Sequence, residues 1–254
     1  MLTVLVPTRG RPDNLAALWQ VFTETCVGDT MLLACADEDD PQLPVYRKVY
    51  EAAERKRLDD EVEDVDLLTA RPSRRFLKRG PRLGLVVGPR LRLGGTLNAV
   101  APVFARQSEF LAFMGDDHRP RTYAWDAAYR EALAALGTGL VYGNDLIQGA
   151  NLPTQVAMTS DIVLATGHMV PPGAVHLFLD NAWLALGRAL DAITYLPDVV
   201  VEHVHPIAGK AAWDAGYAEC NTDALMDADR QVFERWQAET LPTWVRQIKE
   251  YRRG

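Results

Sequence analysis

Apolar residues along this chain follow two spacings, and each spacing predicts a different kind of element. Residues 2–7 form a short β-branched run that ends at Pro7, which is typical of a buried strand. The apolar positions after Pro12 recur at helical spacing and predict a helix (Leu15, Leu18, Trp19 and Phe22). Residues 31–37 form the next apolar run. This strand–helix–strand order predicts a parallel pair of strands joined by a right-handed crossover.

The alternation of strand and helix patterns continues through most of the chain. Residues 71–95 are interrupted by glycine and proline and are expected to be largely loop, as is much of the stretch between 146 and 179. The chain therefore predicts an α/β domain, followed by a mainly polar helical tail over 223–251. The other expected elements are helices over 45–58, 96–105, 125–137 and about 180–190, and strands over 109–115, 139–145, 193–197 and 199–206.

Composition narrows the class of protein only moderately. The 254 residues carry a net charge of −7, which argues against a surface coated in basic charge for nucleic acid. Three scattered cysteines, Cys26, Cys35 and Cys220, predict neither a disulfide framework nor a zinc site. We find no signal-peptide pattern and no apolar segment long enough to span a bilayer, so a cytoplasmic protein is expected.

One segment departs from the acidic character of the chain. Residues 71–92 contain eight basic side chains and no acidic one (Arg71, Arg74, Arg75, Lys78, Arg79, Arg82, Arg90 and Arg92). Three interpretations stay open for this basic loop: a solvated surface, a clamp for a diphosphate, or a contact to a polyanionic acceptor such as DNA.

Polar residues follow the predicted strands just where each strand ends. Residues 8–11, 37–40, 115–119 and 143–145 all stand at such positions. Ligands of α/β sheets bind outside the carboxyl ends of the strands. We therefore expect these side chains to gather along one edge of the sheet.

Asp116 and Asp117 are the first candidates for chemistry at that edge. Hard oxygen ligands at a strand end suit Mg²⁺ or Mn²⁺, which would in turn hold substrate phosphates. The alternative is a simple turn, because Gly-Asp-Asp is also good turn chemistry.

Three further side chains stand near the ends of later elements. Asp180 begins a predicted helix and is expected either to cap it or to act as a general base. His203 and His205 are two residues apart on a predicted strand, so they would share a face and either bind a metal, line a pocket or serve the fold. The sequence contains no phosphate-binding P-loop, no dinucleotide fingerprint and no nucleophile elbow.

Taken together, these motifs resemble the GT-A glycosyltransferases, close to the family 2 pattern. The resemblance rests on VLVPTRGRPDNL, on an acid ending the second strand, on a glycine-then-asparagine stretch, on FMGDDHRP and on DNAWLALGRALDAITYLPDVVVEHVHP. It covers residues 2 to 206. The chain departs from the family at Gly115, which occupies the first position of the D-x-D motif, and at Leu179, where a Glu-Asp pair is frequent. The Q-x-x-R-W motif is absent.

The resemblance implies a role for each matching residue. It implies a single GT-A domain over 1–220, with a nucleotide-binding half over about 1–120 and an acceptor-binding half over about 121–220, and a tail over 221–254. Asp180 would be the catalytic base, and Asp117 with His203 or His205 would hold Mn²⁺ or Mg²⁺. The nucleotide sugar would contact Pro7, Thr8, Arg9, Arg11, Asp37, Gly95, Asn98 and Asp116, with Asp37 reading the base.

The implied function is transfer of a sugar, with inversion, from a nucleoside diphosphate sugar to an acceptor hydroxyl. UDP is the expected donor nucleotide. The acceptor is a small molecule or glycan, or a modified base in DNA held by the basic loop. A nucleotidyltransferase and an inactive nucleotide-sugar-binding module are the two alternatives. A homodimer through the polar tail is also conceivable.

Overall fold

Strand β1 (Leu2–Thr8) is the strand around which the first half of the sheet is built. In the computed structural model, which describes residues 1–60 and 80–252, β1 pairs in parallel with β2 (Thr30–Asp37) and with β4 (Phe110–Phe113). β2 in turn pairs in parallel with β3 (Arg82–Gly88). β1 is buried on both faces, as expected of a parallel strand covered by helices on each side.

The second half of the sheet mixes parallel and antiparallel pairs. β7 (Val156–Thr159) runs antiparallel to both β4 and β6 (Leu140–Asn144). β8 (Ile193–His203) is parallel to β6, and β5 (His118–Pro120) is antiparallel to β8. The strand order is β3-β2-β1-β4-β7-β6-β8-β5, so the predicted α/β fold with a mostly parallel sheet is confirmed.

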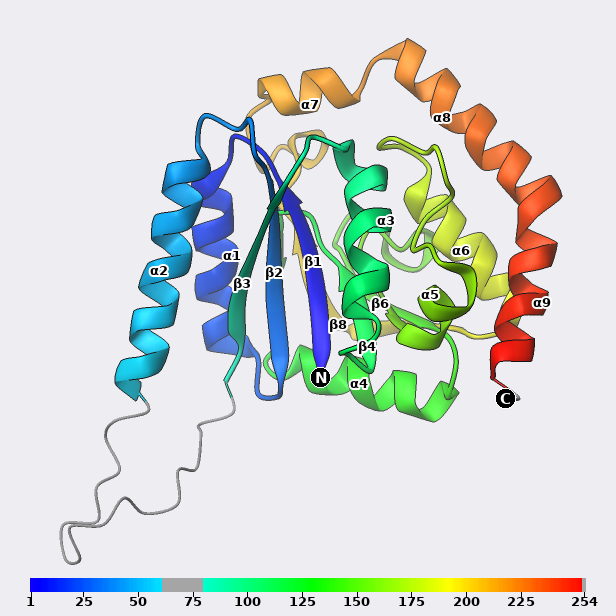
Figure 1. The fold of residues 1–254 in the computed structure, drawn as a ribbon, viewed down its shortest axis with the longest axis horizontal. Coiled ribbons are helices and arrows are strands. Elements are labelled where there is room, and N and C mark those ends of the chain that lie inside the picture. Colours follow the sequence, from blue (N-terminus) through cyan, green and yellow to red (C-terminus); the bar gives the residue numbers. More distant parts are fainter. Residues whose placement is uncertain (61–79, 253–254) are drawn as a thin grey trace, which may run out of the picture.

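Helices cover the two faces of this sheet as two separate layers (Figure 1). Each layer encloses one hydrophobic core, and β1 contributes Leu5 to one core and Val4 and Val6 to the other. One layer consists of α1 (Pro12–Thr25), α2 (Leu43–Asp60) and α4 (Trp125–Leu136). The other consists of α3 (Arg92–Phe104), α5 (Ser160–Thr166), α6 (Leu179–Leu190) and α9 (Leu241–Tyr251).

The C-terminal tail is helical, as predicted, but its apolar side belongs to the core. The helices α7 (Ala215–Cys220) and α8 (Asp223–Arg235) arch over the upper edge of the sheet in Figure 1. A π-helical turn, Trp236–Thr240, leads from α8 into α9. Trp236, Trp244 and Ile248 are buried in the same core as α3 and α6.

The prediction of loop over residues 71–95 is wrong for the part that the structure describes. Residues 82–88 form β3, whose apolar side chains are ordered by pairing with β2. α3 begins at Arg92, four residues before the predicted start of that helix. Residues 71–79 of the basic loop lie outside the described residues.

The expected loop between residues 146 and 179 also contains regular structure. β7 and α5 lie there. The sequence did not predict them because elements of four and seven residues give little periodic signal. The two strands predicted over 193–197 and 199–206 are one strand, β8, which ends at His203. The pairing of β8 with β6 shifts register between Gly143 and Asn144.

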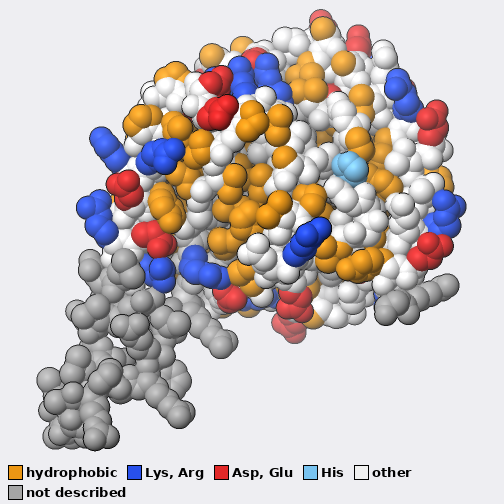
Figure 2. All heavy atoms as spheres, in the orientation of Figure 1, with side chains coloured by type: hydrophobic (Ala, Val, Ile, Leu, Met, Phe, Trp, Pro, Cys, Tyr) orange, Lys and Arg blue, Asp and Glu red, His pale blue; other side chains and the backbone are white. Residues whose placement is uncertain are grey.

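Figure 2 shows one broad face of the molecule, where hydrophobic side chains gather over β1–β3 and α3. No helix lies in front of β2 and β3 in this view, which shows the described residues (Figure 1). Met31 and Val86 are partly exposed, and the apolar residues Leu91 and Val103 are 43% and 54% exposed. Within residues 1–60 and 80–252, no helix is long and apolar enough to cross a bilayer.

Candidate functional site

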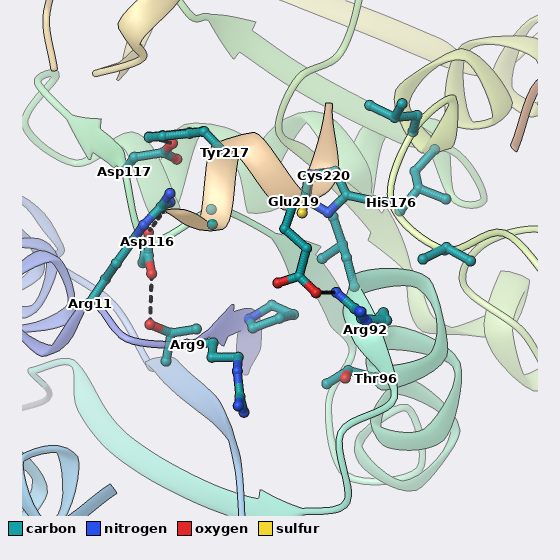
Figure 3. Close-up of a pocket in the computed structure, with 18 of the residues that line it drawn as sticks. Arg9, Arg11, Arg92, Thr96, Asp116, Asp117, His176, Tyr217, Glu219 and Cys220 are labelled. Carbon is teal, nitrogen blue, oxygen red and sulfur yellow. Dashed lines mark hydrogen bonds and ion pairs between the residues drawn. The ribbon is translucent and has the colours of Figure 1, made fainter. Parts of the chain in front are cut away.

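A cavity of about 970 Å³ opens at the carboxyl ends of β1, β2 and β4, beneath α7 (Figure 3). Of the strand-end residues singled out in the sequence, residues 7–11, Asp37 and residues 115–118 line it, whereas residues 38–40, Arg119 and residues 143–145 do not. Asp180, His203 and His205 line the same cavity.

Asp116 is buried under the first βα loop. Thr8 donates a 2.6 Å hydrogen bond to its Oδ2, while Asn14 donates to Oδ1 at 3.4 Å. The guanidinium of Arg11 lies 3.6 Å from the same Oδ1. Burial, and then the charge of Asp117, raise the pKa of Asp116 to about 6. This carboxylate therefore fixes the loop after β1 to the end of β4.

Asp117 lies at the centre of a carboxylate–imidazole cluster. His118 Nδ1 is 3.4 Å from Asp117 Oδ1, and His203 Nε2 is 3.4 Å from Asp117 Oδ2. Burial alone would raise the pKa of Asp117, but the neighbouring imidazoles hold it well below its usual range. The two imidazole rings stack at 4.3 Å between centroids. Ligand atoms of the three residues lie within 4.8 Å of one another, so together they are able to hold a metal ion.

Gly115 takes the first D-x-D position for a steric reason. A Cβ at this residue would lie 2.5 Å from Asp117 Oδ1 and 3.0 Å from His118 Nδ1. The Gly115 N–H donates to that Nδ1 at 2.9 Å, and the His118 N–H donates to the Gly115 carbonyl at 3.1 Å. The segment is therefore a turn as well as a candidate metal site, and the turn folds both candidate ligands back over the glycine.

Asp37, which the resemblance assigned to reading the base, is flanked by two arginines. Arg9 Nη1 lies 3.0 Å from Asp37 Oδ2, and Arg90 Nε lies 3.7 Å from the same oxygen. Burial raises the pKa of Asp37, although the hydrogen bond from Arg9 opposes that shift. Arg90 Nε is buried and has no hydrogen-bond partner among the described residues. A donor, an acceptor and a second donor thus stand side by side.

Asp180 lies in the first turn of α6, so the expectation that it caps this helix is wrong: Phe178 holds the N-cap position. Its Oδ1 accepts only the neighbouring Asn181 N–H among the hydrogen bonds of the described chain. Burial raises the pKa of Asp180. A carboxylate with a raised pKa that faces a cavity is suited to take a proton.

Helix α7 closes the cavity from above and was not anticipated from the sequence as part of the site. In Figure 3, Tyr217 points toward Asp117, and Glu219 points toward Arg92. The Tyr217 hydroxyl donates to Asp117 Oδ2 at 2.7 Å. The guanidinium of Arg11 lies 3.9 Å from the centroid of the Tyr217 ring. A six-residue helix is too short to give a periodic signal in the sequence, and its role in the site depends on contacts with distant residues.

Comparison with solved structures supplies the context for this geometry. No protein-family model matches the sequence, and no curated protein matches it significantly. A mannosyltransferase from Pyrobaculum calidifontis, solved with GDP-Man and Mn²⁺, aligns over 98% of this chain and 73% of its own, at 13% identity and a TM-score of 0.57. Staphylococcus aureus TarS 1-349 aligns over 99% of this chain and 89% of its own, at 11% identity and a TM-score of 0.53. TarS 1-349 in complex with UDP-GlcNAc gives 11% identity and a TM-score of 0.50 over 98% of this chain and 80% of its own.

The chain has a GT-A-like glycosyltransferase fold. Within this GT-A-like fold the histidines do not play equal parts. His118 joins the cluster that can hold a metal, whereas His205 does not. His205 Nδ1 accepts the N–H of Ile207 instead, and its ring lies 4.8 Å from that of Tyr217. The sequence signal for His118 was its place directly after the two aspartates.

One residue that the resemblance assigned to nucleotide contacts, Asn98, holds two segments of the GT-A-like fold together. Asn98 accepts the N–H groups of Met169 and Val170 and donates to the carbonyl of Val170, all within 3.1 Å. Neither Asn98 nor Gly95 lines the cavity. Gly94 is needed for close packing, since a Cβ there would lie 2.0 Å from the carbonyl oxygen of Ala174.

The tail of the GT-A-like fold also shapes the cavity through a buried carboxylate. Asp229 of α8 accepts three backbone N–H groups, from Val175, His176 and Leu177, at 2.7–2.8 Å. These residues line the cavity. Burial lowers the pKa of His176, so the Asp229 clamp presents a neutral imidazole to the cavity.

Proposed function

We propose that this protein is a glycosyltransferase that moves a sugar from UDP-sugar to an acceptor hydroxyl. The observation that carries the proposal is the cavity itself, where a carboxylate–imidazole cluster, four cavity-lining arginines and the carboxylate Asp180 meet beneath α7. The GT-A-like fold supports the assignment, and the two similar enzymes solved with ligands hold GDP-Man with Mn²⁺ in one case and UDP-GlcNAc in the other.

Asp117, His118 and His203 are the residues that would hold a divalent cation. Their candidate ligand atoms all lie within 4.8 Å of one another, and Asp117 and His118 are buried. Two imidazoles and one carboxylate suit Mn²⁺ better than Mg²⁺, because Mg²⁺ prefers an all-oxygen set. When bound, such a cation would neutralise charge on the donor diphosphate.

The choice of uracil is supported by hydrogen-bond complementarity. The Watson–Crick edge of uracil offers an acceptor, a donor and an acceptor. Arg9, Asp37 and Arg90 offer a donor, an acceptor and a donor in the same cavity. Guanine and cytosine offer different patterns on that edge and would leave at least one of these groups opposed by a like partner.

Asp180 is the proposed general base. As the acceptor oxygen attacks the anomeric carbon, the bond from that carbon to the diphosphate oxygen breaks and the hydroxyl proton moves to the Asp180 carboxylate. Attack from the side opposite the leaving group inverts the anomeric carbon. The raised pKa of Asp180 favours this proton transfer.

A small molecule or glycan is the proposed acceptor. All described arginines of the basic loop already have carboxylate partners within the chain, namely Asp29 for Arg82 and Glu219 for Arg90 and Arg92. Arg90 and Arg92 line the donor cavity, so they are placed for the donor rather than for a DNA backbone. Binding of duplex DNA at low salt, lost steeply as salt rises, would instead favour the DNA acceptor.

The test combines donor binding with turnover. Thermal shifts are measured with UDP, GDP, CDP and nucleoside triphosphates, each with and without Mn²⁺, and hydrolysis of UDP-sugars is followed in wild type and Asp180→Asn. We expect metal-dependent stabilisation by UDP, and a turnover loss of about 10²–10⁴-fold in Asp180→Asn with UDP binding retained.

Other outcomes of the same measurements contradict the proposal. Stronger stabilisation by a nucleoside triphosphate would indicate a nucleotidyltransferase. An Asp180→Asn variant without loss of function would indicate a binding module. No response to any nucleotide would exclude both the donor site and the transferase.

A further inference from the structure

Three arginines of the cavity wall take their partners from one short segment, residues 214–219. Asp214 receives two hydrogen bonds from Arg11, at 2.7 Å from Nε and 2.6 Å from Nη2. Glu219 accepts from Arg90 Nη2 at 2.9 and 2.7 Å through its two oxygens, and it also pairs with Arg92. The two carboxylates thus stand at the two ends of α7 and face inward, as Figure 3 shows for Glu219.

The chemistry of these contacts is that of anion recognition. A guanidinium pairs with the oxygens of a carboxylate and of a phosphate through the same planar, two-pronged geometry. A nucleoside diphosphate in the cavity would need cationic donors near its phosphates, and Arg11 and Arg92 line that cavity. In the structure these donors are occupied by carboxylates of the protein itself.

We propose that Arg11 and Arg92 form a diphosphate-binding site and that α7 occupies it with Asp214 and Glu219 until a diphosphate takes their place. The proposal rests on the proposed function only for the identity of the ligand as a nucleoside diphosphate. Binding of that ligand would release α7 from the arginines. The segment is then an internal competitor of the donor.

Competition is favoured over coexistence because the same donor groups cannot pair fully with two anions. A carboxylate left beside a bound diphosphate would also repel it. The ion pairs between α7 and the arginines are weak, because Glu219 is 40% exposed and Asp214 is 44% exposed, and solvent screens such pairs. Tyr217 is the only buried residue of α7.

An opposite role is possible for the same contacts and predicts the opposite sign. If Asp214 and Glu219 held the arginines in a binding-ready geometry, removing their charge would loosen the site and weaken anion binding. If Asp214 and Glu219 compete with the ligand, removing their charge frees the arginines and strengthens anion binding. The sign of the change in affinity therefore decides the matter.

The experiment is calorimetric titration of inorganic pyrophosphate and of UDP into metal-free wild type, Glu219→Gln and Asp214→Asn. We expect both ligands to bind about three- to tenfold more tightly to Glu219→Gln, with a smaller gain for Asp214→Asn. Asp227→Asn is the matched control: it removes the same charge from an exposed carboxylate of α8 that pairs with Arg230. It should leave both affinities within about twofold. Unchanged or weaker binding in both α7 variants overturns the proposal.

A second measurement follows α7 directly and does not depend on a change in affinity. Trp213 is 60% exposed and its ring centroid lies 5.9 Å from that of Tyr217. Pyrophosphate should change the tryptophan emission of wild type, and the change should be lost in Trp213→Phe, which retains binding. Binding without any Trp213-dependent change would mean that α7 stays in place, against the proposal.

The failure of this inference is distinguishable from failure of the proposed function. Tighter pyrophosphate binding in Glu219→Gln, without turnover of any nucleotide sugar, would support the diphosphate-binding site and contradict the proposed transferase activity. Turnover of UDP-sugar, with identical pyrophosphate affinities in wild type and Glu219→Gln, would support the transferase and contradict the competition by α7.

Discussion

The hydroxyl of Tyr217 donates a 2.7 Å hydrogen bond to Oδ2 of Asp117, a residue 100 positions away in the sequence. Asp117 is also the carboxylate that the two imidazoles of the metal cluster surround. The contact therefore joins the helix that covers the cavity to the candidate ligand at its floor. A phenol that orients a metal-binding carboxylate affects the metal without touching it.

Tyr217→Phe should weaken Mn²⁺ binding in the absence of nucleotide. Loss of the hydroxyl leaves the Asp117 carboxylate free to turn, and changes to such supporting groups typically cost about tenfold or more in metal affinity. Titration of Mn²⁺ followed by electron paramagnetic resonance measures the change. Tyr123→Phe, at an exposed tyrosine, is the control. Equal affinity in both variants would show that Tyr217 has no part in orienting Asp117.

His118→Gln should remove a nitrogen ligand from the bound Mn²⁺, whereas His205→Gln should not. His118 is in the cluster with Asp117 and His203, and the Nδ1 of His205 accepts a backbone N–H. We expect a loss of about tenfold or more in Mn²⁺ affinity for the first variant and a small change for the second. Nitrogen couplings in pulsed electron paramagnetic resonance count the imidazoles. Retention of all couplings in His118→Gln, with loss in His205→Gln, would reassign the ligand to His205.

Gly94→Ala should destabilise the protein far more than Gly88→Ala. The new methyl group at position 94 would lie 2.0 Å from the carbonyl oxygen of Ala174, so α3 and that loop would have to separate. No atom lies within 4 Å of a Cβ at position 88. Overpacking of this kind costs about 1–3 kcal/mol. Urea unfolding gives both values, and a harmless Gly94→Ala would mean that the two segments part easily.

Asn98→Ala should weaken the fold and leave UDP affinity almost unchanged. The side chain holds the backbone of Met169 and Val170 through three hydrogen bonds and does not line the cavity. We expect a loss of about 2 kcal/mol in unfolding free energy, since backbone groups lose their partners. Urea unfolding and UDP titration measure the two effects. A stable variant that no longer binds UDP would restore the nucleotide contact that the family resemblance implies.

Asp145→Asn should cost stability at neutral pH and little in acid. Asp145 accepts the N–H groups of Ile147, Gln148 and Gly149 and the hydroxyl of Thr154. Burial opposes ionisation, but these hydrogen bonds prevail and lower the pKa of Asp145 below its usual value. A lowered folded-state pKa gives stability that is present above the unfolded pKa of about 4 and is lost as pH falls through the folded value.

The expected loss for Asp145→Asn is about 1–3 kcal/mol at pH 7, shrinking steadily below about pH 4. Unfolding curves of wild type and variant across pH 3–8 measure the difference. A difference that grew on acidification would contradict the assignment of the charge to the native state.

The amino-acid sequence alone determined the architecture wherever periodicity was long enough to be read. The runs at 2–7 and 31–37, with the helical spacing between them, predicted parallel strands around a crossover, and both strands are in place. Strand ends also predicted where chemistry gathers, because carboxyl ends of parallel strands share an edge. Asp37, Asp117 and Asp180 accordingly line one cavity.

Only the tertiary structure decided which side chains act together in that cavity. The apolar run of β3 was hidden among arginines and glycines, and its order comes from pairing with β2. His118 became a candidate ligand because the turn at Gly115 folds its ring beside Asp117. Likewise Glu219 reaches Arg90 and Arg92 from far along the chain. Sequence periodicity reports which face of an element is buried, whereas contacts between distant segments depend on how the packed elements bring them together.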